Sequence, residues 1–225
     1  MPIYQWNMLI FLIAIISAIL SGRVTAVFNR WDKYPVQSGL TGSQVAKKIL
    51  ESNGIFDVQI GTVNGTLTDH YHPTYKTLNL SSAVANGNSI AALAVAAHEC
   101  GHAIQHHNQY WLLNIRNAIL PLASFGSQAG TYICLIGLLF NGRFLTTLGV
   151  VLFVFAVAFQ ILTLPVEIDA SKRALCILKE NRYIQDDEVR GARKVLTAAA
   201  MTYVIAAIAS IASLLRLLAI TKDDD

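Results

Sequence analysis

Residues 98–102 read His98-Glu99-Cys100-Gly101-His102, and the interpretation of the whole chain depends on this stretch. On a helix, two histidines four positions apart lie on one face, about 6 Å apart along the axis, so both imidazoles can reach one metal ion. Glu99 is rotated by roughly 100° from His98, which places its carboxylate beside the metal, where it can take a proton from water. The spacing predicts a zinc centre that hydrolyses peptide bonds, with Glu99 as the base.

The residues around the motif favour the helix that this chemistry needs. Residues 90–97 are strong helix formers without a breaker, and Asn86-Gly87-Asn88-Ser89 supplies capping residues. We therefore expect a helix from about Asn88 to His107. Gly101 in its middle costs about 1 kcal/mol relative to alanine, which indicates that another segment comes close to the helix there.

The composition predicts a membrane protein. The 225 residues are 54% hydrophobic and 14% charged, with a mean hydropathy of +0.47, which is unusual for a soluble domain. Four stretches have nearly bilayer length and little or no charge, which predicts four transmembrane helices. They are residues 7–28, 118–140, 144–164 and 195–220. A soluble protein with very apolar buried helices is the alternative.

The distribution of basic residues predicts the orientation of these helices. No Lys or Arg precedes the first stretch, so we expect a retained anchor and not a secretory signal. All but three of the 17 Lys and Arg residues fall in segments 23–117 and 165–195. The positive-inside bias therefore places both segments in the cytosol. Because topology accounts for the basic balance, we expect the lipid bilayer as a partner and no nucleic acid.

A catalytic zinc usually has three protein ligands, and Glu167 is the predicted third. It follows the third apolar stretch, and the hairpin of the second and third stretches returns it to the face that carries His98 and His102. Its helical neighbours are small, so this face can pack against the alanine-rich helix of the motif. These neighbours are Ala170, Ser171 and Ala174.

Other polar residues near the motif have competing interpretations. Asp169 points about 160° away from the Glu167 face, so we expect an ion pair with Lys172 or Arg173, or a hydrogen bond to a ligand histidine. His106 continues the stripe of His98 and His102, but three ligands on one straight helix converge poorly on a tetrahedral ion. The three cysteines form no CxxC pair and predict neither a disulfide framework nor a cysteine zinc site.

The segment before the motif predicts a small α+β unit. Thr41-Gly-Ser-Gln44 is a capping box that opens a helix, and strands are expected near 56–60, 66–71 and 77–80. Asn64-Gly65 predicts a hairpin between the first two strands. Residues 76–80 are either an edge strand that binds an extended substrate or an ordinary packed strand.

These predictions combine into a mainly α, multi-pass membrane fold with a small cytosolic, zincin-like α+β unit that carries the HExxH helix. Five regions are expected. They are an anchor (1–28), the cytosolic unit with the HExxH helix (29–117), a transmembrane hairpin (118–164), a cytosolic helix with the third zinc ligand (165–194), and the fourth transmembrane helix with a tail (195–225).

Three separated stretches carry a family resemblance. They are Leu67-Thr-Asp-His-Tyr71, Val95-Ala-Ala-His-Glu-Cys-Gly-His-Ala-Ile-Gln105 and Leu164-Pro-Val-Glu-Ile-Asp-Ala-Ser171. Together they resemble the YugP-like membrane zinc metallopeptidases of bacteria. The resemblance implies a bacterial cytoplasmic-membrane protein that binds Zn²⁺ through His98 and His102, with Glu99 as the catalytic carboxylate. Glu167 to Ala170 fits the Glu-x-x-Ala pattern of related membrane enzymes, whereas Ser171 stands where they often have aspartate.

The expected function is hydrolysis of cytosolic or juxtamembrane peptides and membrane proteins at the cytosolic face. His70, in the first of the three stretches, is a candidate catalytic residue that donates a hydrogen bond to the oxyanion, and a solvated loop histidine is the alternative. A non-hydrolytic membrane zinc-binding or interaction protein is the alternative function. A transporter has little support, because the centres of the apolar stretches lack ionisable residues.

Overall fold

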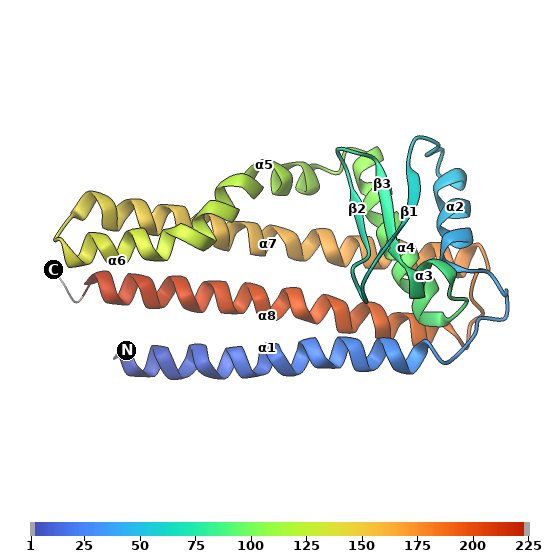
Figure 1. Ribbon diagram of the computed structural model, residues 1–225, viewed down its shortest axis with the longest axis horizontal. Helices are drawn as coiled ribbons and strands as arrows, with labels where there is room; N and C mark the ends of the chain where they lie inside the picture. Colours follow the sequence, from blue (N-terminus) through green and yellow to red (C-terminus); the bar gives the residue numbers. More distant parts are fainter. Residues whose placement is uncertain (1–2, 223–225) are drawn as a thin grey trace. The chain divides into compact units, whose positions relative to one another are not determined.

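The computed structural model describes residues 3–222, so residues 1–2 and 223–225 of the first and last predicted regions lie outside it. The described chain is mainly helical and contains one small sheet (Figure 1). It divides into two compact units. Unit 1 comprises Met1–Ile19, Trp111–Pro165 and Thr202–Asp225, and unit 2 comprises Leu20–Tyr110 and Val166–Met201.

Four described helical stretches are long and apolar enough to cross a membrane. They are Ile3–Trp31, Trp111–Leu139, Arg143–Glu180 and Val189–Thr221. Each contains one of the four predicted apolar stretches, apart from Phe140 at the end of the second, which confirms the mainly α fold with four candidate spans. The helices α1 (Ile3–Trp31), α7 (Arg143–Glu180) and α8 (Val189–Lys222) contribute residues to both units.

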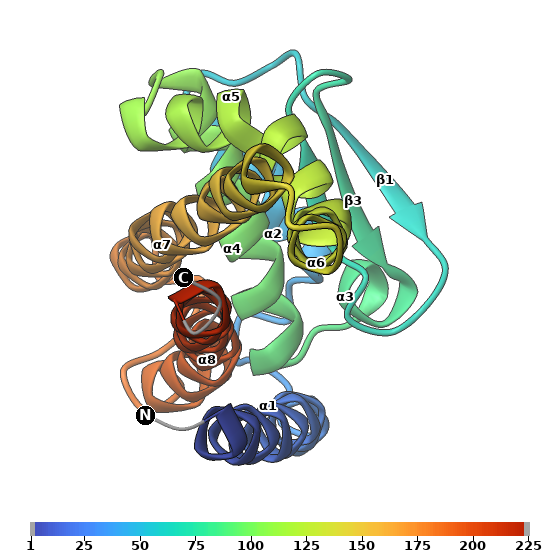
Figure 2. The same cartoon turned by 90° about the vertical axis from the view of Figure 1, so that its left-hand side faces the viewer.

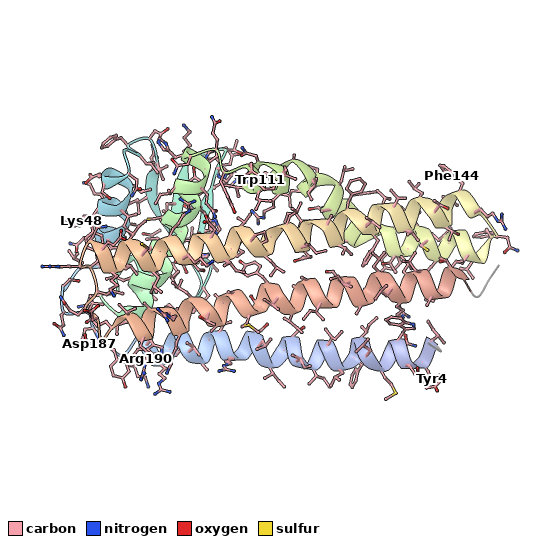
Figure 3. The ribbon with its side chains drawn as sticks, turned by 180° about the vertical axis from the view of Figure 1, so that it is seen from behind. Tyr4, Lys48, Trp111, Phe144, Asp187 and Arg190 are labelled. Carbon is pink, nitrogen blue, oxygen red and sulfur yellow. The ribbon has the colours of Figure 1, made fainter. Side chains whose placement is uncertain are left out.

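Within unit 1, the second candidate span is an irregular helix. It consists of α5 (Trp111–Phe125), the π-helical turn η1 (Gly126–Gly130) and α6 (Thr131–Leu139). A turn then leads to α7, near the Phe144 side chain (Figure 3). A Cβ added at Gly130 would lie 3.0 Å from the Gly149 carbonyl oxygen of α7. Small residues thus let the two helix backbones pack closely, as is common in membrane helix pairs.

Unit 2 is built around two helices that the sequence located well. In α2 (Gly42–Ser52) the Thr41 hydroxyl accepts the Gln44 N–H, while the Gln44 side chain accepts the Thr41 N–H, which confirms the capping box. In α4 (Ile90–His107) the Ser89 hydroxyl accepts the Ala92 N–H. Fully buried side chains of the two helices share one hydrophobic core, among them Val45, Ile49, Leu93 and Ala97.

The three-stranded sheet of unit 2 has the order β1-β3-β2. The strands are β1 (Gln59–Val63), β2 (His70–His72) and β3 (Thr77–Ser81). β3 pairs in parallel with β1 and antiparallel with β2 (Figure 1). The predicted hairpin at Asn64-Gly65 is therefore wrong, because β1 and β2 do not pair. The edge-strand interpretation of residues 76–80 is wrong as well, because β3 lies between its two neighbours.

Burial explains why β3 is central. Its Leu78 and Leu80 side chains are fully buried, and the short helix α3 (Ser82–Asn86) follows it directly (Figure 2). Asp69 joins the start of β2 to the end of β3, because its carboxylate accepts the Ser81 N–H at 2.7 Å and the Ser81 hydroxyl at 3.2 Å. Burial raises the pKa of Asp69. The most apolar strand therefore lies in the middle of the sheet.

Candidate metal centre

The site forms where α4 comes closest to residues 166–180 of α7, all within unit 2. A Cβ added at Gly101 would lie 2.7 Å from the Ala170 carbonyl oxygen and 3.1 Å from its Cα. Ala170 and Ala174 are fully buried. These contacts confirm that another segment approaches Gly101 and that the small face of α7 packs on the HExxH helix.

This approach brings the three predicted metal ligands together. The Nε2 atom of His98 lies 3.3 Å from Oε2 of Glu167, and the Nε2 atom of His102 lies 3.5 Å from the same oxygen. One ligand atom from each of the three residues falls within 4.8 Å of the others. Glu167 is only 4% exposed. The arrangement can hold one metal ion in a mostly buried position.

Each histidine has its second ring nitrogen held by a hydrogen-bond partner. The Ser171 hydroxyl lies 3.1 Å from Nδ1 of His98, and the Gln105 side-chain carbonyl lies 3.0 Å from Nδ1 of His102. Gln105 is fully buried. Its amide nitrogen donates to the Val166 carbonyl and to the Asp169 carboxylate, both at 2.8 Å. Its carbonyl oxygen must therefore face His102.

This network fixes the tautomer of His102. A carbonyl oxygen only accepts hydrogen bonds, so Nδ1 of His102 carries the proton that it donates to Gln105. The Nε2 atom of the neutral ring then presents a lone pair toward Glu167. Holding one imidazole nitrogen so that the other can ligate is the usual support of a metal-binding histidine.

One carboxylate oxygen of Glu167 has no hydrogen-bond partner among the described residues, which indicates that a cation fits this site. The Oε2 atom of Glu167 is buried and accepts no hydrogen bond, although most buried polar atoms in proteins have a partner. Lone pairs of the carboxylate and of His102 thus converge on one point, which a divalent cation would satisfy. Two imidazole nitrogens and one carboxylate oxygen are a donor set that catalytic zinc uses.

Protons compete for the same position when no ion is bound. Burial by itself would lower the pKa of His102, but the neighbouring Glu167 carboxylate outweighs burial and raises that pKa. The site therefore attracts positive charge, either as a proton on an imidazole or as a metal ion.

Glu99 is buried beside the ligand group and is not one of its members. Its Oε2 atom accepts the Tyr71 N–H of β2 at 3.0 Å. The Tyr71 hydroxyl lies 2.8 Å from Nδ1 of His106, and burial raises the pKa of Tyr71 to about 12. The structure thus places His106 against Tyr71, outside the three-residue group.

His70 lies on β2 with an exposed side chain. Its Nδ1 atom is 2.9 Å from the Thr68 carbonyl oxygen, and its Nε2 atom is 3.2 Å from the Asn79 amide nitrogen. The structure does not bring it into the metal-ligand group. Asp169 pairs with Arg173 at 2.6 Å, as expected, and reaches His102 only through Gln105.

Sequence reasoning missed two residues of the site, Gln105 and Tyr71. Gln105 follows His102 by three positions, so the two share a helix face, and a glutamine side chain can hold an imidazole nitrogen. That combination was the available signal. Tyr71 contributes its backbone N–H to Glu99, and a main-chain contact between distant segments leaves no trace in the residue pattern.

The group of His98, His102 and the buried Glu167, with a carboxylate beside it and four candidate membrane spans, defines the class of membrane zinc peptidases. The chain belongs to the family described as "Putative neutral zinc metallopeptidase", which matches residues 6–222. It is 45% identical over 194 residues to the "Putative membrane protease YugP" of Bacillus subtilis (strain 168), a match that covers 86% of each chain. No solved structure matches the chain. The family resemblance and zinc as the cofactor are thereby confirmed.

Proposed function

We propose that this protein is a membrane-integrated zinc metalloendopeptidase of the HExxH type. One observation carries the proposal: His98, His102 and Glu167 converge through a single buried carboxylate oxygen, while Glu99 lies beside them without joining the group. A structural zinc site is closed by four protein ligands, whereas a catalytic site keeps one position open. Three ligands and an adjacent free carboxylate favour catalysis.

In this mechanism Glu99 moves the protons. When bound, zinc would lower the pKa of water and polarise the scissile carbonyl. Glu99 takes the proton from the attacking water and returns it to the leaving amine. The Tyr71 N–H holds Oε2 of Glu99, so Oε1 stays available for the proton. The same hydrogen bond fixes the direction in which the carboxylate points.

Ser171 and Gln105 have a positioning role in this mechanism. The Gln105 side-chain oxygen accepts the Nδ1 proton of His102, and the Ser171 hydroxyl lies within hydrogen-bond distance of Nδ1 of His98, so both rings stay turned toward Glu167. Asp169 supports Gln105 from behind, and Arg173 neutralises Asp169. The orientation of the ligands thus depends on residues from both α4 and α7.

The strand β2 is the candidate platform for the substrate. It is an edge strand of the sheet, and the Tyr71 N–H points away from β3 to the Glu99 carboxylate. An extended peptide along this edge would present its backbone beside Glu99, by the strand addition that many peptide-binding proteins use. This assigns to β2 the part that the sequence suggested for residues 76–80.

His70 is the candidate donor to the oxyanion. Its ring now contacts Thr68 and Asn79, so Nε2 would have to exchange the Asn79 amide for the substrate oxygen. Loss of an oxyanion donor typically lowers kcat by about 10²- to 10³-fold. His70→Ala should therefore reduce kcat and leave KM and zinc content nearly unchanged. A wild-type kcat would exclude His70 from the mechanism.

The site would face the cytosol, where cytosolic peptides and juxtamembrane segments of membrane proteins would be substrates. The basis is the charge bias of the sequence, since basic residues concentrate in the segments that carry His98 and Glu167. The sites of cleavage in a membrane-protein substrate would then lie close to the cytosolic ends of its helices.

The test compares Glu99→Gln with wild type on a diverse peptide library, with and without a chelator. We expect wild type to cleave peptides only in the absence of chelator. Glu99→Gln should retain zinc and lose activity by about 10³-fold, because loss of a general base costs about 10²- to 10⁴-fold. Glu51→Gln, an exposed change on α2, is the matched control.

Two outcomes would contradict the proposal. Cleavage by Glu99→Gln at the wild-type rate would remove Glu99 as the base. Zinc binding without any chelator-sensitive cleavage would favour the alternative, a non-hydrolytic membrane zinc-binding protein.

A further inference from the structure

Away from the metal centre, unit 2 contains a basic cavity between the end of α1 and the start of α8. It has a volume of about 560 Å³. Four basic side chains line it, namely Arg23, Arg30, Arg193 and Lys194. No Asp or Glu lines it, and none of these four side chains forms an ion pair with any residue of the described range 3–222.

Trp31 also lines the cavity and lies beside two of these basic side chains. The Arg30 guanidinium lies 5.9 Å and the Lys194 ammonium 5.8 Å from its ring centroid, one on α1 and one on α8. A Cβ added at Gly191 would lie 2.6 Å from the Trp31 ring, so the two helices are in close contact at that point. Trp31 thus holds cations from both helices beside the cavity.

The remaining lining is mostly apolar and continues along the two helices. Val27 of α1 lines it together with Ala198 and Met201 of α8. Arg23 lies near the end of the apolar stretch 7–28, whereas Arg193 and Lys194 directly precede the apolar stretch 195–220. Figures 1 and 3 show the two helices running side by side, and Figure 3 labels Arg190 one turn before Arg193.

We infer that this cavity binds the phosphate headgroup of an anionic phospholipid. Unpaired cations would neutralise the phosphate, and the apolar lining would accept the first part of the acyl chains. Basic pockets between membrane helices on the cytosolic side bind anionic headgroups in this way, and tryptophan is enriched at the same depth. The inference does not depend on the proposed peptidase activity.

The experiment measures phospholipid binding to the full-length protein in vesicles. The probes are phosphatidylglycerol and phosphatidylcholine, with soluble glycerol 1-phosphate as the free phosphate. Wild type should bind phosphatidylglycerol in preference to phosphatidylcholine. Glycerol 1-phosphate at equal concentration should not displace it. Displacement would assign the cavity to a free phosphorylated molecule and overturn the lipid assignment.

Two variants separate a defined cavity from a diffuse basic surface. Arg193→Gln with Lys194→Gln should weaken phosphatidylglycerol binding by roughly 30-fold, because each basic side chain near an anionic surface contributes about a factor of five. Ala198→Phe fills the cavity without changing the charge and should also weaken binding. The matched control, Lys47→Gln with Lys48→Gln, removes two adjacent exposed charges of α2.

The control variants show whether the phospholipid binds in the cavity or on a diffuse basic surface. If the control pair weakens binding as much as the Arg193 and Lys194 pair, or if Ala198→Phe binds like wild type, the cavity is not the binding site. Zinc content of each variant, measured in parallel, shows that unit 2 remains folded.

Discussion

The side chain of Gln105 illustrates how much of this site depends on one buried amide. It accepts from His102 while it donates to Val166 and Asp169, so it couples the α4 ligand to α7. Gln105→Met keeps the volume and removes these bonds. Zinc affinity should fall by about 10- to 100-fold, as for other supporting partners of metal ligands. Competition with a chromophoric chelator measures it.

The control for this variant is Gln59→Met, at an exposed position on β1. It should bind zinc like wild type. If Gln105→Met bound zinc with the wild-type affinity, zinc binding would not depend on the Gln105 side chain holding one tautomer of His102.

Ser171 allows a graded test at the partner histidine. Its hydroxyl lies 3.1 Å from Nδ1 of His98 and can accept a hydrogen bond from it. Ser171→Ala should weaken zinc binding by about 10-fold, whereas Ser171→Asp should match or exceed wild type, since a carboxylate is the stronger acceptor. Equal affinity in all three proteins, measured in the same competition assay, would show that His98 does not use this contact.

The pH dependence of zinc binding follows from the raised pKa of His102. A raised pKa keeps the imidazole protonated to a higher pH than the usual value of 6.5, so zinc must displace a proton over a wider range. Apparent zinc affinity should therefore start to fall, as the pH is lowered, above pH 6.5. Isothermal titration at several pH values measures it. An affinity that stays constant down to pH 6 would contradict this coupling.

At the scale of the elements, the contact between α4 and α7 rests on Gly101. Alanine there would gain about 1 kcal/mol in helix propensity, but its Cβ would meet the backbone of Ala170, which cannot move aside cheaply. We expect Gly101→Ala to be destabilising by about 1–3 kcal/mol, the usual cost of overpacking, and to lower zinc affinity. Denaturant unfolding measures the first effect.

Gly22 provides the matched control, because it is also helical and a Cβ added there meets nothing within 4 Å. Gly22→Ala should be neutral or stabilising. If Gly101→Ala were equally harmless, the close approach of α7 would not be what forms the site.

The elements show where sequence reasoning succeeded and where it failed. The α2 and α4 helices were predictable because their caps at Thr41 and Ser89 lie within a few residues of the groups that they bind. The order of the strands in the sheet was not predictable, because the parallel pairing of Gln59 with Thr77 joins segments that no turn signal connects. Local patterns therefore located helices better than strand partners.

The residues of the candidate site likewise fall into those that the sequence predicts and those that it does not. The three ligands were predictable because motif spacing and membrane topology both constrain them, although their roles stay a proposal. The contacts of Gln105 and Tyr71 could not be predicted from the sequence, because they depend on how α4 packs against α7 and β2.

For the molecule as a whole, zinc would link α4 to α7 and so stabilise unit 2. A ligand that binds only the folded state adds about 2.7 kcal/mol when its concentration is 100 times its Kd. Removing zinc with a chelator should therefore lower the melting temperature of wild type. A variant without the site, Glu167→Ala, should already melt at the lower temperature and should not respond to chelator. Equal responses of both proteins would contradict the link.

Zinc binding by His98, His102 and Glu167 is best tested by the zinc content of purified wild type, Glu167→Ala and Asp169→Asn. Asp169 is the control because it is the next carboxylate on α7 and contacts Gln105 instead of the ligand group. We expect one zinc per chain in wild type and Asp169→Asn at saturating zinc, and far less than one in Glu167→Ala. A full zinc complement in Glu167→Ala would contradict this expectation.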